Sequence, residues 1–189
     1  GMMKMLPGMT VVVPADHNQT RLATKAVVEW EGPCYLRFGR PVWPIFTPAE
    51  DPTFQIGKAQ FLSEGTDVTI IACGHLVWHA VEAGQQLEKE GYSVELINMH
   101  TIKPLDEEAI LKSVGKTGCV VTAEEHQYNG GLGESVARVL AIHNPAPQEF
   151  VAVKDSFGES GTPTELLEKY GLSPKDIVAA AKKAISRKK

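Results

Sequence analysis

Long apolar runs are missing from the 189-residue chain, and none approaches the roughly 20 residues that a membrane-spanning helix requires. The start of the sequence also lacks a charged stretch followed by an apolar one, so we expect no signal peptide. Gly1 ahead of Met2 looks like a residue left by removal of a purification tag. These absences predict a protein without a membrane partner.

An excess of either charge is absent too. The sequence holds 19 basic and 23 acidic residues, for a net charge of -4, and its one basic run is the terminal "SRKK". Interspersed charges of both signs create no field that would collect nucleic acid or anionic lipid. We therefore expect no nucleic acid among the partners.

Cysteine is scarce, and the three that occur, Cys34, Cys73 and Cys119, include no pair with CxxC spacing. Each lies in an apolar, strand-like run, where a free thiol behaves as a small apolar side chain. This pattern indicates neither a disulfide framework nor a thiolate metal site. It favours a reducing compartment, and we expect the protein in the cytoplasm.

The sequence does contain a regular alternation of strand and helix patterns. Apolar runs such as "VTIIACG" and "CVVTAEE" alternate with helical patterns over residues 75–90 and 106–114, and "FVAVKDSF" follows as a further strand. Two closing helices begin at capping boxes, which are Thr162 with Glu165 and Ser173 with Asp176. Apolar strands between helices predict an α/β fold with three layers and a mostly parallel sheet.

A partial βαβ unit precedes this sheet in residues 1–41. It consists of a strand in "MTVVVPAD", a helix over residues 17–30 capped by Asp16, and a strand in "CYLRF". The inward stripe of the helix is expected to be Leu22, Ala26, Val27 and Trp30. Two strands and one helix cannot bury both faces of their sheet, so we expect this unit to lean on neighbours that the sequence does not contain and to be the end of a larger domain. Residues 42–55 are a proline-rich linker, and residues 56–189 form the second domain.

The stretch "EEHQYNGGLGESVARVLA" raises the possibility of a phosphate cradle. The dinucleotide fingerprint fails because Val136 stands where the third glycine should be, and the lysine of a P-loop is absent. Acidic residues also crowd the start of the following helix, where a phosphate would rest. We expect the glycines to form a tight structural joint in a left-handed turn, and they are Gly130, Gly131 and Gly133.

The histidines form no convincing metal site. His75 and His79 are one helical turn apart, and His75, His100 and His126 each follow the carboxyl end of a strand, where α/β sheets bind ligands. A zinc site needs further ligands, and the sequence "HLVWH" lacks the glutamate of a zinc protease. We expect His79 on a helix flank and the others bonded to loop carbonyls or facing a partner subunit.

Two arginines close the βαβ unit in "CYLRFGRP". Arg40 follows the strand directly, so its planar guanidinium can project from the sheet edge and hold a phosphate at two points. A structural ion pair with a distant acid is the alternative for Arg37 and Arg40. Glu124 and Glu125 could exchange protons at a strand end, but no nucleophile is evident beside them.

Six phrases together resemble one family: "LPGMTVVVPAD", "GPCYLRFGRP", "IGKAQFLSEGTDVTIIACGHLVWHAVEA", "INMHTIKPLDEEAI", "AEEHQYNGGLGESVA" and "FGESGTPTELLEKYGL". In their order and spacing they are similar to the carboxyl-terminal section of transketolase, especially the kind encoded as two subunits. The resemblance covers nearly the whole chain. It implies that residues 1–41 end a pyrimidine-binding domain and that residues 56–189 are the transketolase carboxyl-terminal domain.

The resemblance implies transfer of a two-carbon ketol unit between sugar phosphates in the pentose phosphate pathway. It also implies thiamin diphosphate and Mg²⁺ in the complete enzyme, an amino-terminal section or subunit as partner, and a homodimer. The family's catalytic, cofactor-binding and metal-binding residues match no part of this sequence. We therefore assign no catalytic residue and no metal ligand here, and expect this chain alone to bind no cofactor and to be inactive. One position carries over: Arg40 matches the family arginine that holds the sugar phosphate.

Two alternatives stay open. Deoxyxylulose-phosphate synthases and the β-subunits of 2-oxoacid dehydrogenases share this two-domain segment, although "PADHNQTR" and "YLRFGRP" favour transketolase. A stand-alone module that binds a small ligand or partner near Gly74, His100 and His126 is the non-catalytic alternative.

Overall fold

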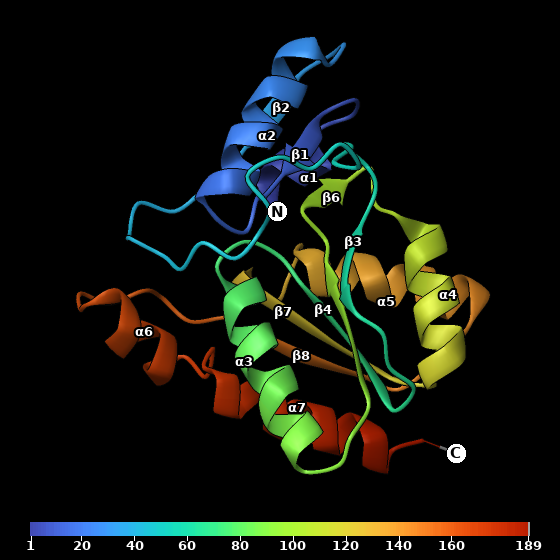
Figure 1. The fold of residues 1–189 in the computed structure, drawn as a ribbon. Coiled ribbons are helices and arrows are strands. Elements are labelled where there is room, and N and C mark those ends of the chain that lie inside the picture. Colours follow the sequence, from blue (N-terminus) through green and yellow to red (C-terminus); the bar gives the residue numbers. More distant parts are fainter. Residues whose placement is uncertain (189) are drawn as a thin grey trace.

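The computed structural model describes residues 1–188 and contains two sheets (Figure 1). The larger sheet has five strands in the order β3-β5-β4-β7-β8. Strands β5, β4, β7 and β8 run parallel, and only β3 is antiparallel to its neighbour. The strands are β3 (Gln60–Ser63), β4 (Val68–Ala72), β5 (Val94–Asn98), β7 (Val120–Gln127) and β8 (Gln148–Val153). The predicted mostly parallel sheet is confirmed.

Helices cover both faces of this sheet, which gives the three layers that the alternating pattern predicts (Figure 1). Helices α3 (Leu76–Lys89) and α7 (Pro174–Ser186) pack on one face, and α4 (Glu107–Thr117) and α5 (Leu132–His143) on the other. The side chains between the sheet and each helix layer are apolar and mostly buried, and those on each face form a separate core cluster. Burial of this apolar surface is the main force that holds the layers together.

The closing helices begin where the sequence signals predict. The hydroxyl of Thr162 and the carboxylate of Glu165 form a capping box at the start of α6 (Pro163–Lys169). Ser173 and Asp176 form the second box at the start of α7. The predicted strand over residues 150–157 is wrong at its end, because β8 stops at Val153 and the following residues are exposed.

The smaller sheet has the order β2-β1-β6 and contains a strand that the sequence patterns miss. Strands β1 (Thr10–Val12) and β2 (Cys34–Leu36) are parallel and flank α2 (His17–Glu29), which is the predicted βαβ unit. Strand β6 (Thr101–Lys103) comes from the middle of the chain and pairs with β1 in antiparallel fashion. The first unit therefore leans on a strand from the second half of the same chain, which corrects the expectation that its neighbours are all absent.

Two further details differ from expectation. A short helix, α1 (Met2–Met5), precedes β1. The buried residues of α2 are Gln19 and Ala23, whereas Trp30 is exposed, so the predicted apolar stripe is only partly covered. None of the helices formed by residues 1–188 combines the length and apolarity that a bilayer crossing requires.

Candidate functional site

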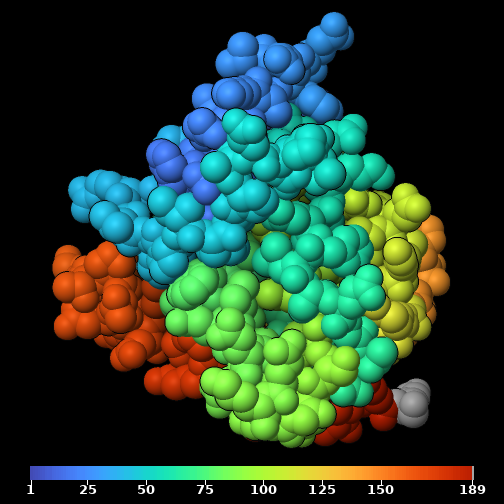
Figure 2. All heavy atoms as spheres, in the orientation of Figure 1, coloured from blue at the N-terminus to red at the C-terminus, as the bar shows by residue number. Residues whose placement is uncertain are grey.

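A cleft of 370 Å³ opens where the carboxyl ends of β2, β4 and β7 meet. One wall is the loop of residues 37–43 after β2, and the floor is Gly74, His75 and Glu125. The other wall is formed by residues before and within α6 and just after it, which are Gly161, Pro163, Leu166, Leu167, Tyr170 and Leu172. We call this cavity the strand-end cleft. In Figure 2 the two walls appear as neighbouring bulges on one side of the molecule.

Arg40 stands at the junction of the strand-end cleft with a second cavity of 450 Å³, which extends to Asp16 and His17. Its side chain is exposed. Each of the four other arginines donates a hydrogen bond, whereas the structure of residues 1–188 shows no hydrogen bond or ion pair from Arg40. A guanidinium without an internal partner is free to bind an anionic ligand in two-point fashion.

Arg37 has a different environment although it lines the same cleft. Its Nη2 donates a hydrogen bond to the backbone carbonyl of Glu125 at 3.0 Å, which joins the end of β2 to the end of β7. Within residues 1–188 neither arginine forms an ion pair with an acid, so the ion-pair alternative has no support for Arg37 or Arg40. The bond from Arg37 leaves Arg40 as the unengaged cation of the cleft.

His75 lies between the two cavities and has contacts on several sides. Its Nδ1 is 3.4 Å from a carboxylate oxygen of Glu125, and its ring stacks on Trp43 with a centroid separation of 4.6 Å. The hydrogen bond with His75 lowers the pKa of Glu125, against the effect of burial, and the charge of Arg37 adds to the lowering. The cleft therefore holds an ionised carboxylate beside an imidazole and two arginines.

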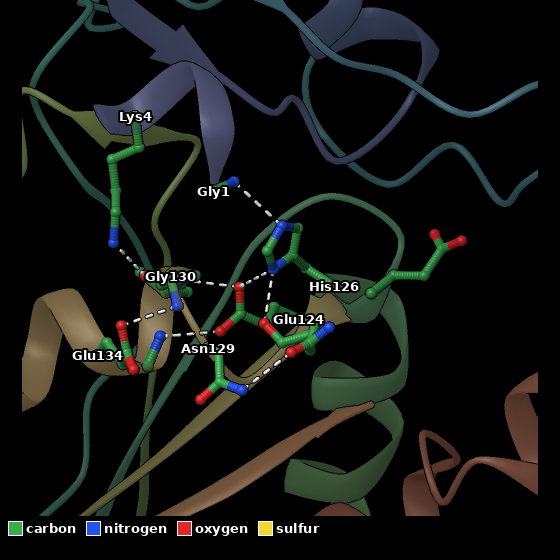
Figure 3. A network of polar contacts seen from close by, with 12 residues as sticks. Gly1, Lys4, Glu124, His126, Asn129, Gly130 and Glu134 are labelled. Carbon is green, nitrogen blue, oxygen red and sulfur yellow. Dashed lines mark hydrogen bonds and ion pairs between the residues drawn. The ribbon is translucent and has the colours of Figure 1, made fainter. Parts of the chain in front are cut away.

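The glycine loop brings the carboxylate of Glu124 to the start of α5 (Figure 3). Glu124 is 3% exposed, and its two oxygens accept the backbone N–H groups of Leu132 at 2.7 Å and Gly133 at 2.9 Å. Burial raises the pKa of Glu124, although these hydrogen bonds act in the opposite direction. The first amides of the helix are satisfied by the protein itself, as helix capping requires.

Close packing accounts for the glycines in this loop. A β-carbon on Gly131 would lie 2.2 Å from Glu124, and one on Gly133 would lie 2.5 Å from the ring of Phe150. Gly130 has a φ of 77°, in the left-handed region that favours glycine. These contacts support the structural role that we expect for Gly130, Gly131 and Gly133.

His79, His100 and His126 are bonded or buried at separate places. His79 Nδ1 lies 2.9 Å from the carbonyl of Leu172, and His126 Nδ1 lies 2.6 Å from the carbonyl of Gln127. His100 is only 2% exposed and stacks on Phe54 with a centroid separation of 4.5 Å. A buried His100 offers no ring to a ligand at the sheet edge, which weakens the alternative of a binding site made by the strand-end histidines.

The described residues do not fit thiamin diphosphate with a metal ion. Residues 1–188 contain no group of three or more His, Cys, Asp or Glu side chains that could hold a metal. The one glycine-rich helix start is filled by the carboxylate of Glu124, which would repel a diphosphate at that place.

Two elements of the site were not apparent from the sequence. Trp43 lies in the proline-rich linker, yet it stacks on His75 and donates from Nε1 to the carbonyl of His75 at 3.2 Å. The 154–162 segment, interpreted partly as strand, instead forms an exposed arm that ends beside the cleft. An aromatic residue among prolines was the one available signal for the first of these.

Comparison with known proteins identifies similar chains over almost the full length. Residues 57–177 match the family model described as "Transketolase, C-terminal domain". The 6-deoxy-6-sulfo-D-fructose transketolase subunit of Clostridium sp. (strain MSTE9) is 45% identical over 98% of this chain. A subunit of the apulose-4-phosphate transketolase of Phocaeicola vulgatus is 39% identical over 95% of it. The chain spans 58% and 57% of the length of these two relatives.

A solved structure described as a split gene transketolase, inactive β4 tetramer, is similar in fold and sequence. It superposes with a TM-score of 0.96 at 47% identity and covers all of this chain, which in turn covers 61% of that protein. More distant relatives include 1-deoxy-D-xylulose-5-phosphate synthase 1 of Geobacter sulfurreducens, with 35% identity over 98% of this chain and 30% of the relative.

Proposed function

The chain belongs to the transketolase family as a carboxyl-terminal section, and we propose that it helps a split enzyme to transfer two-carbon ketol units between sugar phosphates. In this proposal residues 1–41 end the pyrimidine-binding domain, residues 42–55 are the linker and residues 56–189 are the carboxyl-terminal domain. The pentose phosphate pathway is the setting that we infer, and the three free thiols suit a cytoplasmic location.

The observation that carries the proposal is the free guanidinium of Arg40 in the strand-end cleft. Arg40 is exposed, follows β2 at the carboxyl edge of the sheet and lines two adjoining cavities. A sugar phosphate carries two negative charges near neutral pH, and a planar guanidinium binds such a group through paired hydrogen bonds. We assign Arg40 to the phosphate of the sugar, and Gly130, Gly131 and Gly133 to the structural joint.

Thiamin diphosphate is the conventional cofactor of transketolases, and this section does not supply its site. We propose that the cofactor and Mg²⁺ bind to residues of the amino-terminal section, and that this chain alone neither holds them nor turns over substrate. The carboxylate of Glu124, which already accepts the first amides of α5, supports this division of labour.

The partners follow from the same division. We propose an amino-terminal transketolase section or subunit as the obligatory partner, and a dimer of the assembled enzyme. Strand β2 has one neighbour, β1, among the described residues, so its other edge is open to pairing. Apolar side chains near this unit are exposed, including Val28, Tyr35 and Phe38, and an interface would cover them.

The test is reconstitution with the amino-terminal section in the presence of thiamin diphosphate and Mg²⁺. The assembled protein should transfer a ketol unit from xylulose phosphate to ribose phosphate, and Arg40→Ala should raise KM for the phosphorylated acceptor by about tenfold to a hundredfold, equivalent to losing one charged hydrogen-bonding pair. KM for a non-phosphorylated acceptor should change less than about twofold.

Two variants control this test. Arg138→Ala removes an exposed cation of α5 that pairs with Glu107 of α4, away from the strand-end cleft. It should leave KM unchanged. Arg37→Ala tests the neighbouring cation of the cleft, and a larger phosphate-specific effect there than at Arg40 would move the phosphate role to Arg37. A reconstituted enzyme without ketol transfer would contradict the proposed reaction.

A second reaction is included in the same assay because of the more distant synthase relatives. Pyruvate and glyceraldehyde phosphate are offered together, and release of CO₂ without ketol transfer would identify a deoxyxylulose-phosphate synthase section. A thermal-shift screen of the chain alone against metabolites tests the non-catalytic binding module, and a flat response would exclude it.

A further inference from the structure

His75 occupies a position where the second half of the chain contacts the loop that carries Arg40. It is the residue before α3, directly after Gly74, and it lines both the strand-end cleft and the adjoining cavity. Gly74 has a φ of 57° and its N–H donates to the carbonyl of Val13, so the backbone that presents His75 is fixed against β1. The backbone next to His75 is therefore held in place by this hydrogen bond.

Gly39, the residue before Arg40, lies directly against the ring of His75. A β-carbon on Gly39 would be 1.9 Å from Cε1 and 2.4 Å from Nε2 of the imidazole. Atoms cannot approach so closely, so only glycine can occupy this place while His75 keeps its position. The path of the chain into Arg40 is therefore defined by the imidazole.

Trp43, three residues after Arg40, makes the second contact with His75. The two rings are stacked at 4.6 Å with an angle of 18° between their planes, and Trp43 Nε1 donates to the carbonyl of His75 at 3.2 Å. Stacked aromatic pairs contribute beyond the area they bury. His75 therefore contacts the loop on both sides of Arg40, at Gly39 before it and at Trp43 after it.

Glu125 fixes the orientation of the imidazole itself. Its carboxylate oxygen lies 3.4 Å from His75 Nδ1, and its backbone carbonyl accepts the hydrogen bond from Arg37. The side chain of His75 is 13% exposed, so the ring is enclosed by these neighbours and not free to rotate in solvent. His75 is oriented by β7 and in turn holds both ends of the loop of residues 39–43.

We propose that His75 is a positioning residue, which places the guanidinium of Arg40 for a sugar phosphate by fixing residues 39–43. The role rests on the proposed function of Arg40. It gives the carboxyl-terminal domain a part in substrate affinity, because the imidazole acts on the ligand only through the loop and not by touching the reacting atoms. A loop held in its binding conformation loses less conformational entropy when the ligand binds.

A double-mutant cycle in the reconstituted enzyme tests this role. His75→Ala should raise KM for the phosphorylated acceptor by about fivefold to tenfold while kcat stays within about twofold, since the loss is in binding. In the Arg40→Ala background the same substitution should raise KM less than about twofold, because residues that act through one another are non-additive. Equal effects of His75→Ala in both backgrounds would overturn the proposal.

A spectroscopic readout on the chain itself tests the geometry without turnover. With ¹³C-labelled arginine, the Cδ–Hδ signal of Arg40, assigned by its loss in Arg40→Lys, should shift in His75→Ala. The matched control is His143→Gln, an exposed histidine at the end of α5, which should leave that signal unmoved. An unchanged Arg40 signal in His75→Ala would overturn the proposal.

A third variant guards against unfolding of His75→Ala. His75→Phe keeps an aromatic ring between Gly39 and Trp43 but loses the contact with Glu125. Its KM for the phosphorylated acceptor should therefore rise by no more than about half of the rise seen in His75→Ala. If His75→Ala unfolds, Trp43→Leu takes its place in the cycle and in the spectrum, with the same expected results. Failure of Trp43→Leu to move the Arg40 signal would then overturn the proposal.

The two proposals fail in distinguishable ways. If Arg40→Ala does not alter KM, the phosphate role of Arg40 is wrong, and the Arg40 signal still decides whether His75 fixes the loop. If Arg40→Ala raises KM and His75→Ala does not, the positioning role is wrong and the proposed function stands.

Discussion

Asp16 accepts both the backbone N–H and the hydroxyl of Thr47, at 2.7 and 2.6 Å. The same carboxylate caps α2 through the N–H of Gln19 at 2.9 Å and accepts the N–H of Phe46 at 2.8 Å. Asp16 is 5% exposed, so these four bonds form in a region shielded from water. The side chain of Asp16 therefore caps α2 and also holds the proline-rich linker at Phe46 and Thr47.

Replacing Asp16 by Ala should lower the free energy of unfolding by about 2–4 kcal/mol, because buried N–H groups lose a charged acceptor. Urea denaturation measures the change. Burial alone would raise the pKa of Asp16, but the four hydrogen bonds lower it below its ordinary value of 3.8. The stabilisation is therefore present above pH 3.8 and lost as the pH falls through the native pKa.

The control for this prediction is Asp155→Asn, at an exposed carboxylate with no partner among the described residues. Asn tolerates the left-handed backbone at this position, where φ is 46°. The control should change the free energy of unfolding by less than about 0.5 kcal/mol. An equally small change for Asp16→Ala would show that the linker is held by other contacts.

His100 should make the protein less stable in mild acid. Burial lowers its pKa from 6.5 to about 4, so the unfolded chain takes up a proton below pH 6.5 that the native ring refuses. The sign follows from linkage: stability is highest above pH 6.5 and falls between pH 6.5 and 4, by on the order of 3 kcal/mol at most. Chemical denaturation across this range measures the slope.

The comparison for His100 uses two substitutions. His100→Phe removes the titrating group while keeping a ring against Phe54, so it should flatten the dependence between pH 6.5 and 4. His143→Gln removes an exposed histidine and should leave the dependence as it is. A wild-type slope that survives in His100→Phe would assign the acid sensitivity to another group.

Gly39→Ala should destabilise the protein by about 1–3 kcal/mol through overpacking against His75. Gly39 does not have a positive φ, so the effect comes from lack of space rather than from backbone strain. Gly158→Ala is the matched substitution, because a β-carbon there meets nothing within 4 Å. Thermal unfolding of both variants checks the difference, and equal midpoints would show that the loop moves away without cost.

Glu124→Ala should remove the cap of α5 and lower the free energy of unfolding by about 1–3 kcal/mol, since the N–H groups of Leu132 and Gly133 stay buried without an acceptor. Hydrogen exchange at these two amides should accelerate more than exchange at the middle of the helix. Glu88→Ala, at an exposed position on α3, is expected to change neither measurement.

Local signals account for the parts of the fold that the sequence predicts. The capping boxes at Thr162 and Ser173 involve residues three apart, and the apolar strands are recognisable from their own composition. Strand β6 is only three residues long and pairs with residues about 90 positions earlier in the chain. No local pattern marks such a strand, because its stability comes from its partner.

Local sequence patterns also predict only part of the candidate site. A strand end places Arg40 at the edge of the sheet, so its neighbourhood was predictable from chain order. The stacking of Trp43 on His75 depends on the path of the proline-rich linker, which forms no helix or strand between residues 37 and 59. Proline shows that regular structure is excluded there, but it does not say where the chain goes.

Strand β6 joins the two halves of the chain independently of the linker. A protease cut at the exposed residues 48–50 would break the peptide without releasing either product, since β1 and β6 would remain hydrogen-bonded across the nick. Two polypeptides divided at that point would each expose an unsatisfied strand edge until they met. Each half would therefore depend on the other to satisfy the backbone groups of its strand.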